Sequence, residues 1–199
     1  MKFTIYSAAL LAILFTSSSE LSAQSIENGS QVKKNNTQKG IRLSTGIETY
    51  GPLNKNTRSL YEGGYGFYVQ TELPVFHSDK FFLTGTYGYS VMNTKEDATG
   101  KSLRPDMKRF TSKGGMKYFP LNNFYVQAEV GTSMLLNKSS FDNAKSMAFT
   151  FAPRVGYQLP LGGHSGLDMS AKYDLTGTHY AGGKSLNMLA LNLGYTYRF

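Results

Sequence analysis

The chain has 199 residues, a formal net charge of +8, 40% hydrophobic residues and no cysteine. This length corresponds to one domain, and the lack of cysteine excludes a disulfide framework and a thiolate metal site. The positive charge is spread along the chain instead of forming one basic patch, which argues against a nucleic-acid-binding protein.

The N-terminus has the pattern of a secretory signal peptide. A charged start precedes an apolar core at residues 5–15, and Ser22 and Ala23 supply the small residues of a cleavage site. The apolar core is too short to span a bilayer as a helix. We therefore expect residues 1–23 to direct export. Residues 24–39 are polar and lack periodicity, so we expect them to form a flexible periplasmic lead.

From Gly40 onward, apolar and polar residues alternate in eight runs. The runs cover residues 41–50, 64–75, 81–92, 108–119, 124–136, 146–159, 167–176 and 186–199. Successive side chains of a strand point to opposite faces, so each run predicts a strand with one apolar face. Runs of this length are long for a soluble sheet but suit strands tilted across a bilayer. We therefore predict an all-β fold, an eight-stranded antiparallel up-and-down transmembrane β-barrel over residues 40–199.

The connections between the runs alternate between short turns and longer polar loops. Each short turn opens with an apolar residue and proline, at Leu73-Pro74, Phe119-Pro120 and Leu159-Pro160. Proline lacks the N–H that strand pairing needs, so we expect it to end each strand. Short turns at one end and longer loops at the other are typical of transmembrane barrels, in which the short turns are periplasmic.

Two strands carry a local irregularity. The run 108–119 has only a thin apolar stripe, which a bulge at Gly114-Gly115 or a contact with another protein would explain. Pro153 lies in the middle of another run, where we expect a kink or bulge.

The face opposite the apolar one is charged, and we assign it to the lumen. Its charged residues are Arg42, Glu48, Glu72, Arg109, Lys113, Lys117, Glu129, Arg154, Asp168, Lys172, Asp174 and Arg198. The interior of an eight-stranded barrel is just wide enough for side chains to fill, so these groups must pair or hydrogen-bond. Glycines on the same face would leave room for the long arginine and lysine side chains. We expect a salt-bridged lumen without a wide pore.

Aromatic residues recur at the turn-side ends of the strands. They are Tyr118, Phe124, Tyr157, Tyr195, Tyr197 and Phe199. Amphipathic rings prefer the headgroup region of a bilayer, so we expect these residues to form an interfacial girdle.

The last run alternates strictly from Leu189 to Phe199 and ends in Tyr197-Arg198-Phe199. It resembles the final strand of bacterial outer-membrane barrels, and the layout from Gly40 onward is similar to the small eight-stranded barrels of the OmpX and outer membrane protein A transmembrane-domain type. The resemblance implies location in the bacterial outer membrane, contact with its lipid and lipopolysaccharide, and recognition of the C-terminal strand by the barrel-assembly machinery. It leaves the role open, because such barrels include structural proteins, adhesins, narrow channels and lipid-modifying enzymes.

The residues favour no catalytic, cofactor or metal site. His77 and His164 fall in predicted periplasmic turns, and only His179 lies in an outer loop, without a spaced set of catalytic or metal-binding partners. We therefore expect a non-enzymatic protein with a structural or surface-interaction role, whose basic outer loops suit the phosphates of lipopolysaccharide. The alternatives are a narrow passive, porin-like channel, a lipid-A-modifying enzyme, and a soluble secreted barrel with an apolar ligand cavity.

Overall fold

The computed structural model describes residues 40–75, 78–96, 102, 104–141, 144–179 and 185–199. The predicted signal peptide and periplasmic lead lie outside these described residues. The strands are β1 (Arg42–Pro52), β2 (Tyr61–Pro74), β3 (Phe81–Thr94), β4 (Met107–Tyr118), β5 (Phe124–Leu135), β6 (Met147–Gly162), β7 (Ser165–Thr176) and β8 (Leu186–Arg198). Two short helical segments, α2 (Lys55–Arg58) and η1 (Lys138–Ser140), lie in connections. Within the described part of the chain, no helix is long and apolar enough to cross a membrane.

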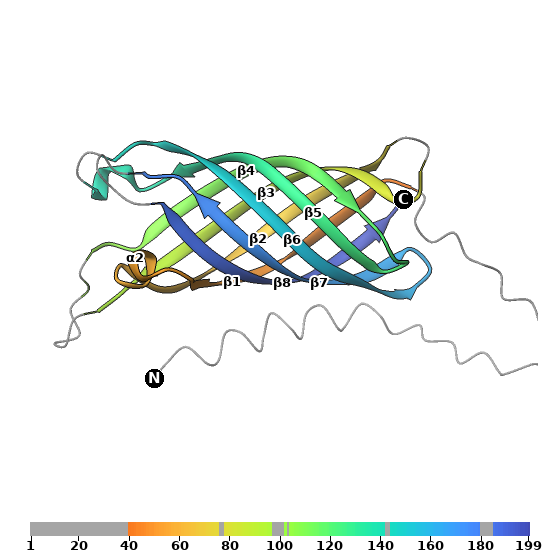
Figure 1. Ribbon diagram of the computed structural model, residues 1–199, viewed down its shortest axis with the longest axis horizontal. Helices are drawn as coiled ribbons and strands as arrows, with labels where there is room; N and C mark the ends of the chain where they lie inside the picture. The colour runs from red at the N-terminus through yellow and green to blue at the C-terminus, as the bar shows by residue number, and fades with distance from the viewer. Residues whose placement is uncertain (1–39, 76–77, 97–101, 103, 142–143, 180–184) are drawn as a thin grey trace, which may run out of the picture. The chain divides into compact units, whose positions relative to one another are not determined.

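The eight strands form one closed sheet (Figure 1). Each strand pairs antiparallel with its neighbour in sequence, and β8 pairs back onto β1 with Arg198 opposite Arg42 and Ala190 opposite Tyr50. Closure leaves no strand at an open edge, so each strand pairs with a neighbour on both sides. The predicted all-β, eight-stranded up-and-down barrel is confirmed.

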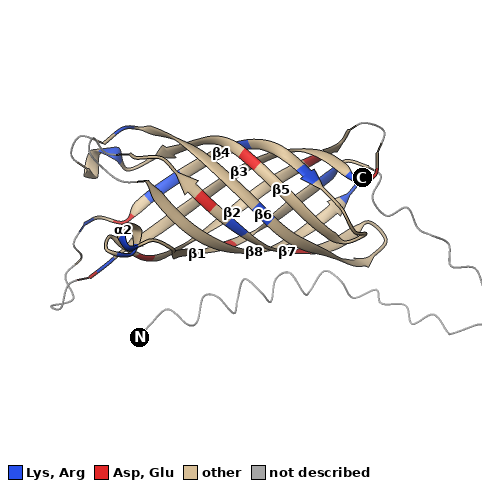
Figure 2. Ribbon diagram, viewed as in Figure 1, with Lys and Arg blue, Asp and Glu red and all other residues tan. Residues whose placement is uncertain are grey.

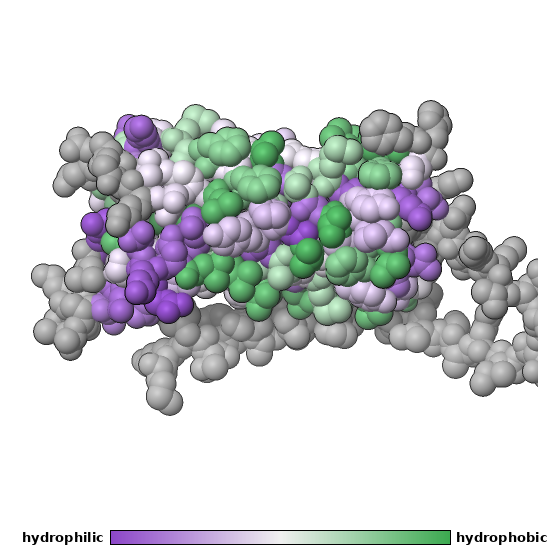
Figure 3. Space-filling model, in the orientation of Figure 1, coloured by the Kyte–Doolittle hydropathy of each residue, from purple (hydrophilic) through white to green (hydrophobic). Residues whose placement is uncertain are grey.

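Alternation along each strand separates an apolar wall from a polar interior. In β8, Leu191 and Leu193 are exposed while Asn192 and Thr196 are buried. Figure 3 shows hydrophobic side chains over much of the barrel wall and strongly hydrophilic residues near the end that carries α2. Soluble proteins rarely expose apolar area on this scale. The arrangement is the reverse of a soluble barrel with an apolar cavity.

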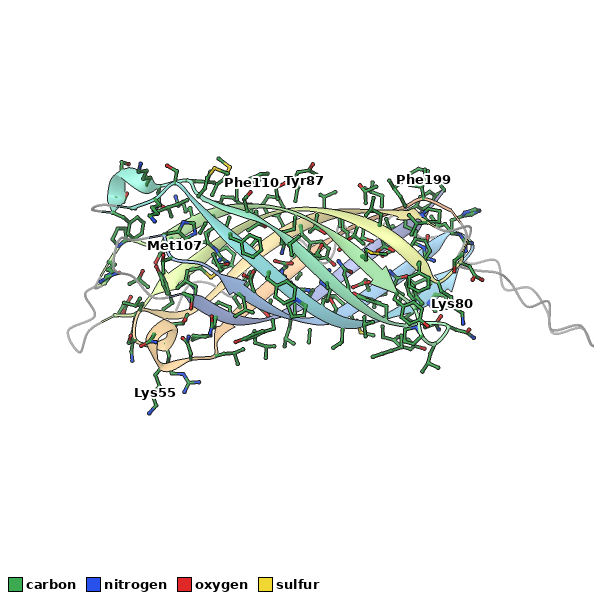
Figure 4. The ribbon with its side chains drawn as sticks, turned by 45° about the horizontal axis from the view of Figure 1, so that its top comes forward. Lys55, Lys80, Tyr87, Met107, Phe110 and Phe199 are labelled. Atoms are coloured by element: carbon green, nitrogen blue, oxygen red, sulfur yellow. The ribbon has the colours of Figure 1, made fainter. Side chains whose placement is uncertain are left out.

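The connections differ at the two ends of the barrel. The β2–β3, β4–β5 and β6–β7 turns lie at one end, here called the turn end, together with the start of β1 and the end of β8 (Figure 1). The other connections, with α2 and η1, lie at the opposite end, here called the loop end. Figure 4 shows Lys80 and Phe199 at the turn end and Lys55 at the loop end.

The three proline turns are not identical. β2 ends at Pro74 and β4 ends before Pro120, as predicted. β6 instead continues through Pro160 to Gly162, with a register irregularity between these two residues. Gly162 has a φ of 106°, a value that suits glycine because it has no Cβ, and this lets the strand turn sharply after the proline.

Of the two explanations for the thin apolar stripe of β4, a bulge at Gly114-Gly115 is absent. Gly114 pairs with Gly85 on β3 and Val130 on β5 in a register that runs unbroken along β4. The paired glycines Gly85 and Gly114 therefore leave this part of the outer face without side chains, and the strand pairing is undisturbed.

Pro153 also causes no bulge. It pairs with Ala128 on β5, while pairing with β7 stops at Phe151 and resumes at Arg154 in the same register. Proline cannot donate a ladder hydrogen bond, so the interruption on one side replaces the expected bulge.

Candidate functional site: the charged lumen

Eleven of the twelve residues assigned to the lumen are buried inside the barrel, each with 5% or less of its surface exposed. They come from β1, β2, β4, β5, β6 and β7, and Figure 2 shows charged positions at several heights along the barrel. The exception is Arg198, which lies half-buried at the turn end and donates from Nη2 to the Gly163 carbonyl at 3.2 Å. Six cations and five carboxylates therefore share the barrel interior.

The layer of charges nearest the turns is centred on Glu72. Lys117 Nζ makes a close ion pair with Glu72, and Arg42 Nη1 lies 3.7 Å from the second Glu72 carboxylate oxygen. Lys117 also lies 3.9 Å from Asp168, whose carboxylate accepts a hydrogen bond from the Tyr125 hydroxyl at 2.8 Å. Each buried carboxylate here has at least one cation beside it, as burial requires.

An apolar cluster closes the lumen beside this layer. Phe82, Phe119 and Tyr125 are buried together, and we call them the turn-end seal. The Arg42 guanidinium lies 4.3 Å from the Phe82 ring centre, and Lys117 Nζ lies 4.1 Å from that of Tyr125. Desolvated cation–π contacts of this kind contribute about 2 kcal/mol. The seal and the charged layer therefore stabilise each other.

The central layer is organised around Arg154. Its Nη2 lies 3.6 Å from Glu129 and 3.8 Å from Glu48, and its Nη1 donates to the Gln70 side-chain oxygen at 3.1 Å. Lys172 Nζ lies 2.7 Å from Glu48, which gives that carboxylate a second cation. These contacts join β1, β2, β5, β6 and β7 across the interior.

The third layer, toward the loops, contains Arg109 and Asp174. Thr176 links them, because it accepts a hydrogen bond from Arg109 Nη1 at 3.3 Å and donates one to Asp174 at 2.7 Å. Tyr50 donates its hydroxyl to Glu48, and its ring centre lies 5.6 Å from the Arg109 guanidinium. Tyr50 thus connects the third layer with the central one.

A second apolar cluster, here called the loop-end seal, covers the third layer. Its buried members are Tyr50, Tyr61, Met92, Met107, Leu135, Ala144, Leu186, Met188 and Ala190. Leu60 and Phe141, from two of the loops, pack against it. Figure 4 places Met107 at this end of the barrel. The charged layers therefore lie between two apolar clusters, one toward each end of the barrel.

The tyrosines inside the lumen were not predicted from the sequence. Tyr68 pairs with Gly46, where an added Cβ would lie 2.8 Å from Tyr68 Cε1. Tyr125 pairs with Gly156, where a Cβ would lie 2.5 Å from the Tyr125 hydroxyl. Gly46 and Gly156 thus make room for tyrosine rings, whereas the sequence pattern predicts room for arginine and lysine. The usable signal is a glycine on the same face as a tyrosine of the neighbouring strand.

The six aromatic residues of the expected girdle lie at the turn end. Tyr118 is half-buried and stacks on Phe81 with ring centres 4.5 Å apart, while the other five are exposed on the wall. Tyr197 and Phe199 meet edge to face at 5.1 Å. The six rings therefore cover part of one rim of the barrel, on β4, β5 and β6 and at the end of β8.

The described histidines belong to connections. His179 is buried in the β7–β8 loop, where its Nδ1 lies 3.3 Å from the Lys145 carbonyl and its own carbonyl accepts the Lys145 N–H at 2.5 Å. Burial lowers the pKa of His179 from its usual 6.5, so the ring is neutral at pH 7. His164 Nδ1 lies 2.9 Å from the Arg198 carbonyl, and His77 is outside the described residues. Within the described ranges, no group of three metal-binding side chains occurs.

Comparison with known proteins identifies the fold. Scans against family models and curated proteins find no match. The outer membrane protein Ail of Yersinia pestis in a bilayer nanodisc shares 14% identity over 81% of this chain and 100% of its own, with a TM-score of 0.54. The outer membrane protein AlkL in lipid bilayers shares 14% identity over 87% and 97% of the two chains, with a TM-score of 0.51. The chain therefore has the fold of the small eight-stranded outer-membrane barrels.

Proposed function

We propose that this chain is a non-enzymatic outer-membrane barrel with a closed lumen, which acts through its structure and its outer surface instead of conducting solutes. The observation that carries the proposal is the enclosure of three charged layers between two apolar seals. An ion crossing the barrel would have to displace the buried aromatic and methionine side chains of both seals. It would also have to separate ion pairs that are held in a medium of low dielectric.

The apolar wall supports placement in a membrane. Phe67, Phe149 and Leu191 are each more than half exposed and face outward, so lipid would remove their surface from water. Residues 1–23 would direct export as a cleavable signal peptide. β8 would be the segment that the barrel-assembly machinery recognises. The turn end would then face the periplasm and the loop end the exterior.

The loop end carries an excess of positive charge that would face lipopolysaccharide. Its cations in the described part of the chain are Lys55, Arg58, Lys95, Arg104, Lys108, Lys138 and Lys145. In the same described part, the loop end has three carboxylates, those of Glu62, Glu96 and Asp106. Cationic side chains at this depth would pair with the phosphates of the outer leaflet.

The first outer loop is held in a fixed position. The Asn54 side chain caps α2 by accepting the Thr57 N–H at 2.7 Å. The buried Thr57 hydroxyl in turn accepts the Asn187 N–H of β8 at 3.1 Å. Lys55 and Arg58 therefore project from a loop that is anchored to the barrel, which suits recognition of a surface partner.

The test is ion conductance of the refolded protein in a planar lipid bilayer. Folding is checked first by the shift in gel mobility between unheated and boiled samples, and a known porin serves as the positive control for fusion. We expect no discrete openings from the folded protein. Reproducible single-channel steps would overturn the closed lumen and favour the narrow channel. Failure of the folded protein to enter bilayers would overturn the membrane location.

A further inference from the structure

A small cationic cavity opens at the turn end of the barrel. Its volume is about 70 Å³, and three basic side chains line it, those of Arg42, His164 and Arg198. The side-chain amides of Asn122, Asn123 and Gln158 also line it. No acidic residue contributes to the described lining. A site of this composition suits a small anionic group.

The basic groups of the cavity are held in place by the fold. Arg42 is 3% exposed, donates to the Gln158 side-chain oxygen at 2.8 Å and lies over the Phe82 ring. The Arg198 guanidinium is fixed by the Gly163 carbonyl at 3.2 Å, and the Arg198 carbonyl holds His164 at 2.9 Å. A bound anion would therefore meet a preformed site.

The two arginines occupy directly opposite positions on the paired strands β1 and β8. Directly opposed residues share one face of a sheet, and like charges in such positions repel each other. Glu72, 3.7 Å from Arg42 Nη1, offsets part of this repulsion, and an anion between the two guanidinium groups would offset it further. Phosphate fits best, because its oxygens match the forked geometry of arginine donors.

An apolar groove lies next to the cavity, on the outer wall. It is open, has a volume of about 460 Å³ and is lined by Pro120, Leu121, Asn122, Asn123, Phe124 and Tyr157. Asn122 and Asn123 line both the cavity and the groove, so the two spaces adjoin. Leu121 is 69% exposed, and Phe124 and Tyr157 are two of the six aromatic residues at the turn end.

We propose that the cavity and the groove together bind one anionic phospholipid of the turn-side leaflet. The phosphate would occupy the cationic cavity and an acyl chain would lie along Leu121, Phe124 and Tyr157. A phosphodiester without a compensating cation fits better than a zwitterionic headgroup, because the described lining offers no carboxylate to a choline or ethanolamine. The site rests on the proposed membrane location, which puts the groove in contact with lipid.

The test uses the full mature chain refolded into nanodiscs made of equal parts phosphatidylglycerol and phosphatidylcholine with the same acyl chains. After insertion is confirmed, the protein is extracted into mild detergent and its retained lipid is counted by native mass spectrometry. We expect several-fold preference for phosphatidylglycerol. Arg198→Gln should remove most of that preference, because it deletes a charge-assisted donor to the phosphate. Lys80→Gln removes a turn-end cation outside the cavity and should leave the preference unchanged.

A second pair of variants tests the groove without altering charge. Leu121→Ser should lower phosphatidylglycerol retention, whereas Leu161→Ser should not, because Leu161 is 57% exposed at the same end but lines neither space. Both positions are exposed, so neither change should prevent folding.

Three results would overturn the proposal. They are equal retention of the two lipids by the inserted protein, equal effects of Arg198→Gln and Lys80→Gln, and binding of inorganic phosphate without retained lipid. The last would leave an anion site that holds no lipid. A folded protein that fails to enter nanodiscs would overturn the proposed function itself, whereas insertion without lipid preference would overturn only this site.

Discussion

Tyr125 occupies the space that Gly156 leaves open on the neighbouring strand, and this contact can be tested by adding one methyl group. A Cβ at Gly156 would lie 2.5 Å from the Tyr125 hydroxyl and 2.7 Å from Ser170 Cβ. We expect Gly156→Ala to lower the free energy of unfolding by about 1–3 kcal/mol through overpacking. The measurement is a urea titration of the protein folded into lipid vesicles. Tyr125→Leu should reduce the cost of Gly156→Ala, since it removes the clashing atoms.

Gly85 provides the matched control for this prediction. It is also a strand glycine, in β3, but a Cβ there would meet no atom within 4 Å. Gly85→Ala should therefore change the free energy of unfolding by no more than about 0.5 kcal/mol. Equal losses at Gly85 and Gly156 would mean that strand propensity, and not tyrosine packing, determines the cost.

The period of two assigns a face to each residue, and this is why the lumen charges could be selected from the sequence. It does not say how far along the barrel axis each charged side chain lies, or which charged side chain it contacts. Lys172 and Glu48 are 124 positions apart and meet only because the strands between them fix the stagger of the barrel. The turn-end and loop-end seals depend on the same stagger, so neither could be predicted from the sequence.

Among the connecting elements, the β5–β6 and β7–β8 loops are joined by two contacts between Lys145 and His179, which we call the clasp. The Lys145 N–H donates to the His179 carbonyl, and His179 Nδ1 lies 3.3 Å from the Lys145 carbonyl. Burial lowers the pKa of His179, so the open or unfolded state takes up a proton more readily than the clasped state. Stability that depends on the clasp is therefore present above pH 6.5 and is lost as the pH falls below it. We expect hydrogen-exchange protection of the Lys145 amide, corrected for intrinsic rate, to decrease between pH 7.5 and 5.

His179→Gln and His164→Gln separate this clasp from general effects of acid. The first removes the titrating ring from the clasp and should abolish the pH dependence at the Lys145 amide. The second changes a histidine of the turn end and should leave that dependence intact. An unchanged pH profile in His179→Gln would assign the effect to another group.

Most strand boundaries could be predicted, because the alternation of apolar and polar residues stops where turn-forming residues such as proline, glycine and asparagine begin. β6 was the main exception, since it extends past Pro160 to Gly162. At Pro153, the missing N–H interrupts the ladder on one side only, and the register is kept by pairing with Ala128 on the other. A closed sheet supports each strand on both sides, and this is not visible in the sequence of a single strand.

At the scale of the whole barrel, Arg154 on β6 contacts residues of three other strands, Glu48 on β1, Gln70 on β2 and Glu129 on β5. Its removal leaves Glu129 with Lys113 at 4.0 Å and Glu48 with Lys172 at 2.7 Å as their remaining ion-pair partners, so Arg154→Met should lower the global free energy of unfolding by about 3 kcal/mol. Adding Glu129→Gln should recover part of the loss. Arg58→Met, at an exposed position of α2, is the control and should cost no more than about 0.5 kcal/mol. The same urea titration in vesicles measures all three, and an equal loss in Arg58→Met would contradict the central role of Arg154.

The seam between β1 and β8 also sets the order of events during synthesis. β1 emerges first and finds one of its two partners only when the last strand has been made, so the barrel cannot close while the chain is still growing. Until then each strand has one charged face and one apolar face. Water solvates only the first, and lipid solvates only the second. Joining the ends of so long a loop is slow. Closure of the barrel, and with it the complete charged interior, therefore has to follow the synthesis of β8.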